Sequence, residues 1–219
     1  MLDSQEWKDW YTGGTRFLWI HGIPGAGKTV LASFLIQQLP TQPISSLSIA
    51  SAYYYCYFGH DQDETEPLLR WTVSQLCRQT RRVPPSILSV FERGHSPSVS
   101  GLLDGLADMV LLFERVNIIV DAVDESKEPR TALLSVLETL AMAKRFENVR
   151  LLVTSRQYFD IKSVFSTCSV PACIQADKIE MDIRIHVHAT LRTHQRFAKW
   201  PADLRDQMED VLAVRARGM

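Results

Sequence analysis

Eight residues, GIPGAGKT from Gly22 to Thr29, constrain the fold of this chain more than any other stretch. They match the pattern G-x-x-x-x-G-K-[ST], between a short apolar run at 17–21 and a segment at 30–39 with a helical period. Glycines let the backbone curl so that successive N–H groups point inward, and the following helix adds the positive end of its dipole. This order of strand, glycine-rich turn and helix predicts a loop that binds the phosphates of a nucleotide.

The same loop carries two side chains with separate roles. We expect Lys28 to act catalytically by reaching the β- and γ-phosphates, and Thr29 to offer its hydroxyl to Mg²⁺. The expected nucleotide contacts are Gly22, Ile23, Pro24, Gly25, Ala26, Gly27, Lys28, Thr29 and Val30.

A second candidate site lies in NIIVDAVDES, residues 117–126. The apolar run ends at Asp121, which falls at the carboxyl edge of the expected sheet and is the second candidate metal ligand. Asp124 and Glu125 follow shortly after Ala122. Ala122 is a small residue at the position where many nucleotide hydrolases have the water-activating acid. One of these two acids is expected to orient or deprotonate the attacking water, with Glu125 slightly favoured. The alternative is that both only stabilise the start of the next helix.

A third apolar run, at 149–156, ends in Thr154, Ser155 and Arg156. A cation at this strand end can meet a γ-phosphate and so distinguish a triphosphate from a diphosphate. Arg156 is the candidate for this role, with Thr154 or Ser155 as weaker polar candidates. The alternative is a surface arginine that closes the strand.

Strand patterns alternate with helical patterns through most of the chain, which predicts an α/β fold with a parallel sheet between helices. Together with the phosphate loop, this indicates a three-layer P-loop NTPase with a mostly parallel sheet. Alternate residues of the aromatic run YYYCYF (53–58) are expected to pack under helices. The expected strands are 17–21, 46–58, 116–121, 149–156 and a weaker one near 172–177, and the later helices include 67–80, 98–115 and 128–144.

The organisation changes near both ends of the chain. Residues 1–14 are expected to form a helical lead-in, with Ser4 capping a helix at 4–11. Residues 15–178 form the expected nucleotide-binding core. After about residue 178 the pattern is wholly helical, so 179–219 is expected to be a small helical appendage.

Composition restricts the partners. Lys+Arg 24 against Asp+Glu 25 gives a formal net charge of -1, so no global field favours nucleic acid or anionic lipid. No window has the roughly 18 uninterrupted apolar residues that a membrane span requires. The four cysteines are scattered and form no CxxC pair, which favours thiols in a reducing compartment. We therefore expect a soluble, cytoplasmic protein that binds neither nucleic acid nor membrane.

The spacing of IIVDAVDE, with a small residue after the first acid and the acidic pair displaced, resembles the modified Walker B motif of NACHT-domain NTPases of the STAND class. The loop LWIHGIPGAGKTVLASFLI and the strand end LLVTSR strengthen the match. The chain is similar over about 15–219 to the nucleotide-binding domains of fungal NOD-like receptors, which carry ankyrin or other repeats. In that family the displaced acidic pair is normal, and the resemblance implies that Arg156 is the γ-phosphate sensor.

The resemblance also implies a role in the cell. A signalling switch of innate immunity would bind Mg²⁺ and a nucleotide, hydrolyse the triphosphate slowly, and self-associate in the triphosphate state. An effector upstream and repeats downstream are implied, with 179–219 as the truncated start of a helical lid. The absence of an N-K-x-D motif favours ATP over GTP without deciding between them. Two alternatives stay open, a nucleotide-binding scaffold without turnover and a P-loop kinase.

Overall fold

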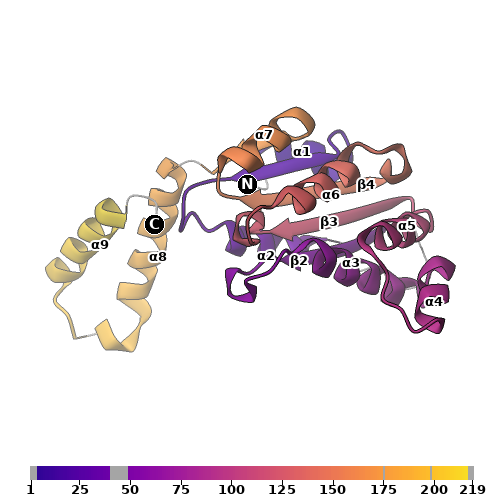
Figure 1. Ribbon diagram of the computed structural model, residues 1–219. Helices are drawn as coiled ribbons and strands as arrows, with labels where there is room; N and C mark the ends of the chain where they lie inside the picture. Colours follow the sequence, from indigo (N-terminus) through magenta and orange to yellow (C-terminus); the bar gives the residue numbers. More distant parts are fainter. Residues whose placement is uncertain (1–3, 40–48, 175, 198, 217–219) are drawn as a thin grey trace.

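The computed structural model describes residues 4–39, 49–174, 176–197 and 199–216. Its centre is a five-stranded sheet in the order β2-β3-β4-β1-β5, with every neighbouring pair parallel (Figure 1). This confirms the expected parallel three-layer α/β fold. The strands are β1 (Phe17–His21), β2 (Ile49–Tyr55), β3 (Arg115–Asp121), β4 (Val149–Ser155) and β5 (Val170–Cys173).

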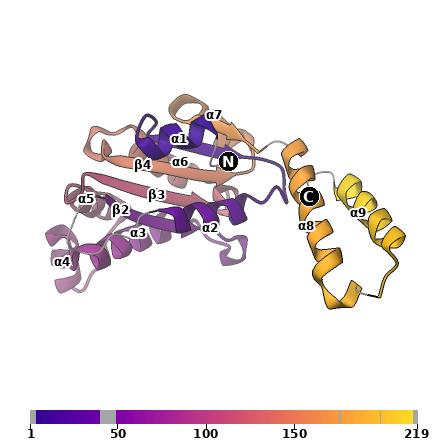
Figure 2. The same cartoon turned by 180° about the vertical axis from the view of Figure 1, so that it is seen from behind.

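Helices cover both faces of the sheet, as the two opposite views show (Figures 1 and 2). One face packs against α1 (Gln5–Thr12) and α2 (Lys28–Gln38). The other face packs against α3 (Thr65–Thr80), α5 (Val99–Val110), α6 (Thr131–Met142) and α7 (Phe159–Cys168), while α4 (Pro85–Glu92) lies against α5. Among the described residues, short 3-10 turns lie at η1 (Phe58–His60), η2 (Val123–Glu125), η3 (Lys144–Phe146) and η4 (Gln195–Phe197).

The alternation of side chains along each strand explains why both layers are apolar. On β1, Phe17 and Trp19 enter the core under α7, while Leu18 and Ile20 enter the core under α1 and α2. All four are at most 2% exposed. The strand that leads into the phosphate loop is therefore held from both sides, which fixes where that loop begins.

The edge strand β2 is protected by two glutamines from α3. Gln75 accepts the Tyr53 N–H at 3.2 Å and donates to its carbonyl at 2.8 Å. One helical turn later, Gln79 makes the same pair of bonds to Ser51, at 3.3 and 2.8 Å. The two side-chain amides imitate a neighbouring strand, so they occupy backbone groups that would otherwise be open to pairing with another chain.

Changing Gln75 and Gln79 together to alanine is expected to lower the free energy of unfolding by about 1–2 kcal/mol, because water replaces the amides only in part. The double variant should also self-associate more, since the strand edge becomes available. Urea unfolding and light scattering measure the two effects. Gln37→Ala, at an exposed position of α2, is the matched control. Scattering equal to that of the control would contradict the edge-protection role.

The last two helices form a hairpin beyond the sheet. α8 (Ala176–Thr193) and α9 (Ala202–Ala216) pack on each other at the carboxyl edge, where Figures 1 and 2 show them set apart from the other helices. Two ion pairs join them, Arg184 to Asp210 at 2.7 Å and Arg192 to Asp206 at 3.0 Å. A hydrogen bond of 2.8 Å between His188 Nδ1 and Glu209 Oε2 lies between these pairs. Helical structure thus begins at residue 176, close to the expected change of pattern at 178.

Several expected boundaries shift. The helix expected at 98–115 ends at Val110, and residues from Arg115 onward belong to β3. The weak strand expected near 172–177 is β5, which ends at Cys173. Residues 46–48 of the expected second strand lie outside the described residues. Within the described part of the chain, no helix is both long and apolar enough to cross a membrane.

Candidate functional site

The glycine-rich loop joins β1 to α2 at the carboxyl edge of the sheet. Gly25 and Gly27 have φ angles of 75° and 79°, in the left-handed region that side chains with a Cβ disfavour. Gly27 is also the N-cap of α2, so the helix begins at Lys28 and its free N–H groups face the loop. The backbone therefore has the shape expected of a phosphate-binding loop.

The Lys28 ammonium folds back over this loop. Its Nζ donates to the carbonyls of Gly22 and Ile23, at 3.0 and 2.9 Å. Burial lowers the pKa of Lys28 below its usual range, while the carboxylate of Asp124 acts in the opposite direction and the Arg156 guanidinium lowers it further. A bound polyanion would favour the charged ammonium, because it adds negative charge beside a partly desolvated cation.

The turn after β3 carries the acidic pair. Ala122 has a φ of 56°, one of three non-glycine residues with positive φ in the described chain, and the turn η2 follows at once. The chain therefore turns at this small residue. A left-handed alanine costs about 1 kcal/mol, so neighbouring contacts must hold this turn in place.

Asp121 lies at the end of β3 and is 2% exposed. Its Oδ1 accepts the Thr154 hydroxyl at 2.5 Å, and the same hydroxyl oxygen accepts the Ala122 N–H at 2.9 Å. Thr154 thus fixes both the carboxylate and the start of the turn. Ser155 points to the other side of β4, where its hydroxyl accepts the Trp19 indole N–H at 2.8 Å, so it does not face the loop.

Asp124 is paired with Arg156. Its Oδ1 accepts the Arg156 backbone N–H at 2.9 Å, and its Oδ2 lies 3.2 Å from Arg156 Nε. The Asp124 side chain is 4% exposed and that of Arg156 is 41% exposed. Both carboxylate oxygens therefore contact Arg156, the residue that follows β4, and hold this candidate sensor arginine beside the acidic turn.

Glu125 has a different set of neighbours. Its Oε2 accepts the backbone N–H of Phe58 at 3.2 Å, from the segment that follows β2. The same segment is tied to the acidic turn a second time, since the Glu64 N–H donates to the Ser126 hydroxyl at 3.2 Å. Glu125 is half-buried and less tightly engaged than Asp124.

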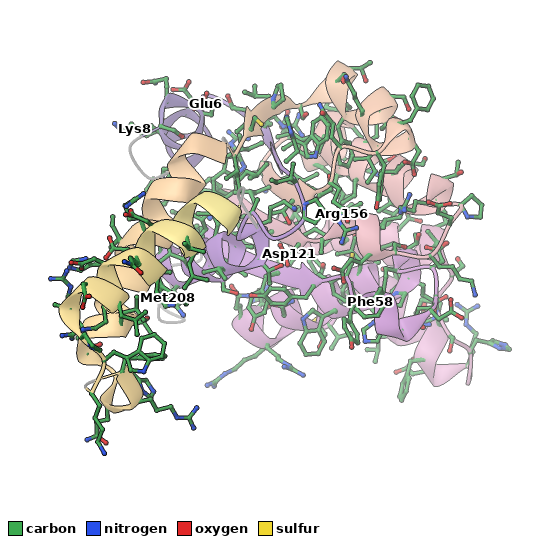
Figure 3. The ribbon with its side chains drawn as sticks, turned by 90° about the vertical axis from the view of Figure 1, so that its left-hand side faces the viewer. Glu6, Lys8, Phe58, Asp121, Arg156 and Met208 are labelled. Carbon is green, nitrogen blue, oxygen red and sulfur yellow. The ribbon has the colours of Figure 1, made fainter. Side chains whose placement is uncertain are left out.

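The phosphate loop, Asp124, Glu125 and Arg156 meet around one cavity of about 260 Å³, whose lining does not include the buried Asp121. It is lined by loop residues from Pro24 to Val30 and by Ala122, Asp124, Glu125, Thr154 and Arg156. Figure 3 looks onto this end of the sheet and labels Asp121, Arg156 and Phe58. Backbone N–H groups of the loop, two carboxylates and a guanidinium, from segments that follow three strand ends, thus surround one space. The hydroxyl of Thr29 and the carboxylate of Asp121 are hard oxygen donors of the kind Mg²⁺ takes.

A second cavity of about 450 Å³ adjoins the first. Its lining includes His21, Tyr158, Cys173 and Ile174, and it shares Pro24 and Arg156 with the first cavity. Burial lowers the pKa of His21, and the positive charges of Lys162 and Lys28 add to this effect. The neutral imidazole is therefore favoured here.

Comparison with known families decides the affiliation. Residues 1–156 match the family model described as Nephrocystin 3, N-terminal. The chain belongs to the nephrocystin 3 N-terminal family. The matched segment of this nephrocystin 3 N-terminal domain ends at Arg156, so it contains the phosphate loop, the acidic turn and the third strand end.

Curated proteins and solved structures give further likenesses. The chain is similar to the vegetative incompatibility protein HET-E-1 of Podospora anserina, with 22% identity over 237 residues, covering 100% of this chain and 17% of that protein. Its fold is similar to a Walker-type ATPase of Pyrococcus abyssi (TM-score 0.57, 12% identity, 97% of this chain and 63% of that one). It is also similar to a STAND protein with a tetratricopeptide repeat sensor from Pyrococcus horikoshii (TM-score 0.51, 12% identity, 97% and 28%).

Together these matches confirm the expected resemblance to NACHT-like P-loop NTPases. The chain spans 17% of the length of the curated relative, so it corresponds to a small part of that longer protein.

Three residues beside the site were not expected from the sequence: Phe58, Tyr158 and Arg130. Phe58 acts through its backbone, which no side-chain pattern reveals. Arg130 did leave a signal, because a cation at the start of a helix opposes the helix dipole. An arginine in that position indicates that acidic or carbonyl groups nearby hold it.

Proposed function

We propose that this chain is a Mg²⁺-dependent nucleotide-binding module that hydrolyses a nucleoside triphosphate slowly and works as a signalling switch. One observation carries the proposal: the phosphate loop, the acidic turn and Arg156 line the same cavity of about 260 Å³. ATP is the proposed nucleotide, since the sequence lacks the guanine motif. The fold likeness to ATPases supports the reaction class.

Each residue of the site has a proposed role. Lys28 and the loop N–H groups bind the phosphates, and Thr29 with Asp121 holds Mg²⁺, which neutralises phosphate charge when bound. Glu125 is the proposed group that orients or deprotonates the water, because both oxygens of Asp124 are already engaged by Arg156. Asp124 is then the residue that holds Arg156.

The pair of Arg156 and Asp124 suggests how the nucleotide state is read. A γ-phosphate in the cavity competes with Asp124 for the guanidinium, whereas a diphosphate is too short to do so. Arg156 would exchange partners between the two states and carry the backbone of β4 and its following segment with it. This is a two-state element of the kind a switch requires.

The wider roles are proposals as well. The likeness to a vegetative incompatibility protein supports a signalling function in innate immunity. We propose that residues 15–178 form the nucleotide-binding core, that 1–14 lead into it, and that 179–219 begin a helical lid above the carboxyl edge. Self-association in the triphosphate state, and effector and repeat domains, belong to the same proposal. All four cysteines are free thiols, which supports a cytoplasmic location.

Nucleotide binding by the wild type and by Lys28→Ala tests the proposal. Loss of the ammonium is expected to weaken ATP and ADP binding by about 10- to 150-fold, the equivalent of 1.5–3 kcal/mol for a charge-assisted contact. Isothermal titration calorimetry in the presence of Mg²⁺ measures this. Lys8→Ala, an exposed lysine of α1, is the matched control. Equal affinity in the wild type and Lys28→Ala would overturn the proposal, and binding without phosphate release would indicate a scaffold.

A further inference from the structure

Arg130 is a buried cation directly behind the acidic turn. Its side chain is 4% exposed, although it is the N-cap residue of α6 and forms no part of the phosphate cavity. Burying a guanidinium costs several kcal/mol unless its donors are satisfied, and apolar residues often stabilise a core as well or better. The position therefore calls for a reason beyond stability.

Two contacts of Arg130 fix the backbone of the turn. Its Nε donates to the Ser126 carbonyl, and one terminal nitrogen donates to the Asp124 carbonyl, both at 3.1 Å. These carbonyls flank Glu125 on either side. The turn itself starts from the left-handed Ala122 and is only three residues long, so it depends on external contacts for its shape.

The other contacts of Arg130 reach toward α7 and Arg156. One terminal nitrogen donates to Asp160 at 2.6 Å, and the other donates to Glu128 at 2.9 Å. The guanidinium carbon lies 5.4 Å from the ring centre of Tyr158, whose hydroxyl accepts a hydrogen bond from Arg156 at 3.1 Å. A single buried side chain therefore contacts both the backbone that carries the acids and the aromatic residue beside the guanidinium of Arg156.

We propose that Arg130 is a positioning residue for nucleotide hydrolysis: it holds the backbone on both sides of Glu125 and, through Tyr158, the guanidinium of Arg156. The inference rests on the proposed hydrolytic function. Arg130 does not line the phosphate cavity, so it is expected to act on the rate of the chemical step and not on affinity. A shift of about 1 Å in a reacting group can cost about 10²-fold in rate, which sets the scale of the effect.

Arg130→Lys keeps the positive charge but lacks the planar fork that donates to two carbonyls and two carboxylates together. It is expected to lower kcat for ATP hydrolysis by about 10- to 100-fold. The ATP dissociation constant, measured by calorimetry, should stay within about threefold of wild type. Asp160→Asn, at a side chain that is 41% exposed, keeps both carbonyl contacts and is expected to lower kcat by less than about tenfold. Arg145→Lys, in an exposed ion pair with Asp104, is the matched control and should leave kcat unchanged.

The possible results distinguish a failure of the proposed positioning role of Arg130 from a failure of the proposed hydrolytic function. Wild-type protein that binds no nucleotide, or binds it without turnover, overturns the hydrolytic function and this inference with it. Turnover in the wild type with an unchanged kcat in Arg130→Lys and Asp160→Asn overturns the inference alone. A parallel loss of kcat, affinity and thermal stability in both variants shows a merely structural role and also overturns it. Partial recovery of kcat in Arg130→Ala on addition of millimolar methylguanidine supports it.

Discussion

Replacing Glu125 with glutamine should leave the nucleotide bound and slow phosphate release by about 10²- to 10⁴-fold, the usual contribution of a positioned acid or base. The amide oxygen of the new side chain still accepts the Phe58 N–H that Glu125 accepts now, so the segment after β2 keeps its anchor. The change removes the charge and the capacity to take a proton. Single-turnover phosphate release, with ATP affinity measured in parallel, gives the two quantities.

Asp124→Asn is the informative comparison. Asparagine keeps an oxygen for the Arg156 N–H but loses the ion pair with the guanidinium, so we expect altered discrimination between ATP and ADP together with slower turnover. Glu138→Gln, an exposed acid on α6, controls for the loss of one negative charge. Wild-type turnover in Glu125→Gln combined with abolished turnover in Asp124→Asn would exchange the roles of the two acids.

The sequence predicts the fold, and it predicts where the candidate site residues lie along the strands, because both depend on local patterns. The run at 17–21, the glycines of the loop and the helix after Lys28 each follow from short-range preferences. The strand ends at Asp121 and Arg156 fall together because parallel strands share a carboxyl edge. These features needed no knowledge of side-chain contacts.

Contacts between distant segments are what the sequence does not reveal. Arg156 pairs with Asp124, 32 positions away, and Glu125 meets the backbone of Phe58, 67 positions away. Such contacts depend on the orientation of each side chain after the strands have paired. The sequence therefore could not distinguish the two acids, whereas the structure does: Asp124 is paired with Arg156, and Glu125 is not.

The aromatic run YYYCYF (53–58) is a second case in which the sequence pattern predicts the structure only in part. Alternate residues do pack inward, since Tyr54 and Cys56 lie against the core. Tyr53 and Tyr55 on the opposite side stay 39% and 36% exposed. A strand pattern does not state whether the strand lies at the edge of the sheet, and β2 does. The helix expected at 98–115 is present, but its expected end was wrong, because LLFER contains no glycine or proline to mark the end at Val110.

The first helix packs into the core of the protein through its two tryptophans. Trp10 is 1% exposed and packs with Leu18, Leu35 and Leu152 in the core under α1 and α2. Its indole N–H donates to the Leu151 carbonyl at 2.9 Å, and its ring stacks on that of Trp7 with centres 5.3 Å apart. The helix is thus joined to the central strands by both an apolar contact and a hydrogen bond.

Trp10→Ala should therefore lower the free energy of unfolding by about 3–5 kcal/mol, because it leaves a large cavity and a carbonyl without its donor. That is a large part of the 5–15 kcal/mol that a domain usually has, so the variant is expected to melt at a clearly lower temperature. Urea unfolding of the wild type and variant gives the difference. Tyr11→Ala, at a side chain that is 39% exposed on the same helix, should cost about 1 kcal/mol or less. Equal stability of the two variants would contradict the role of α1 in the core. If the variants differ as expected, α1 stabilises the sheet that carries the phosphate loop. The apparent nucleotide affinity of Trp10→Ala should then fall as the fraction of folded protein falls.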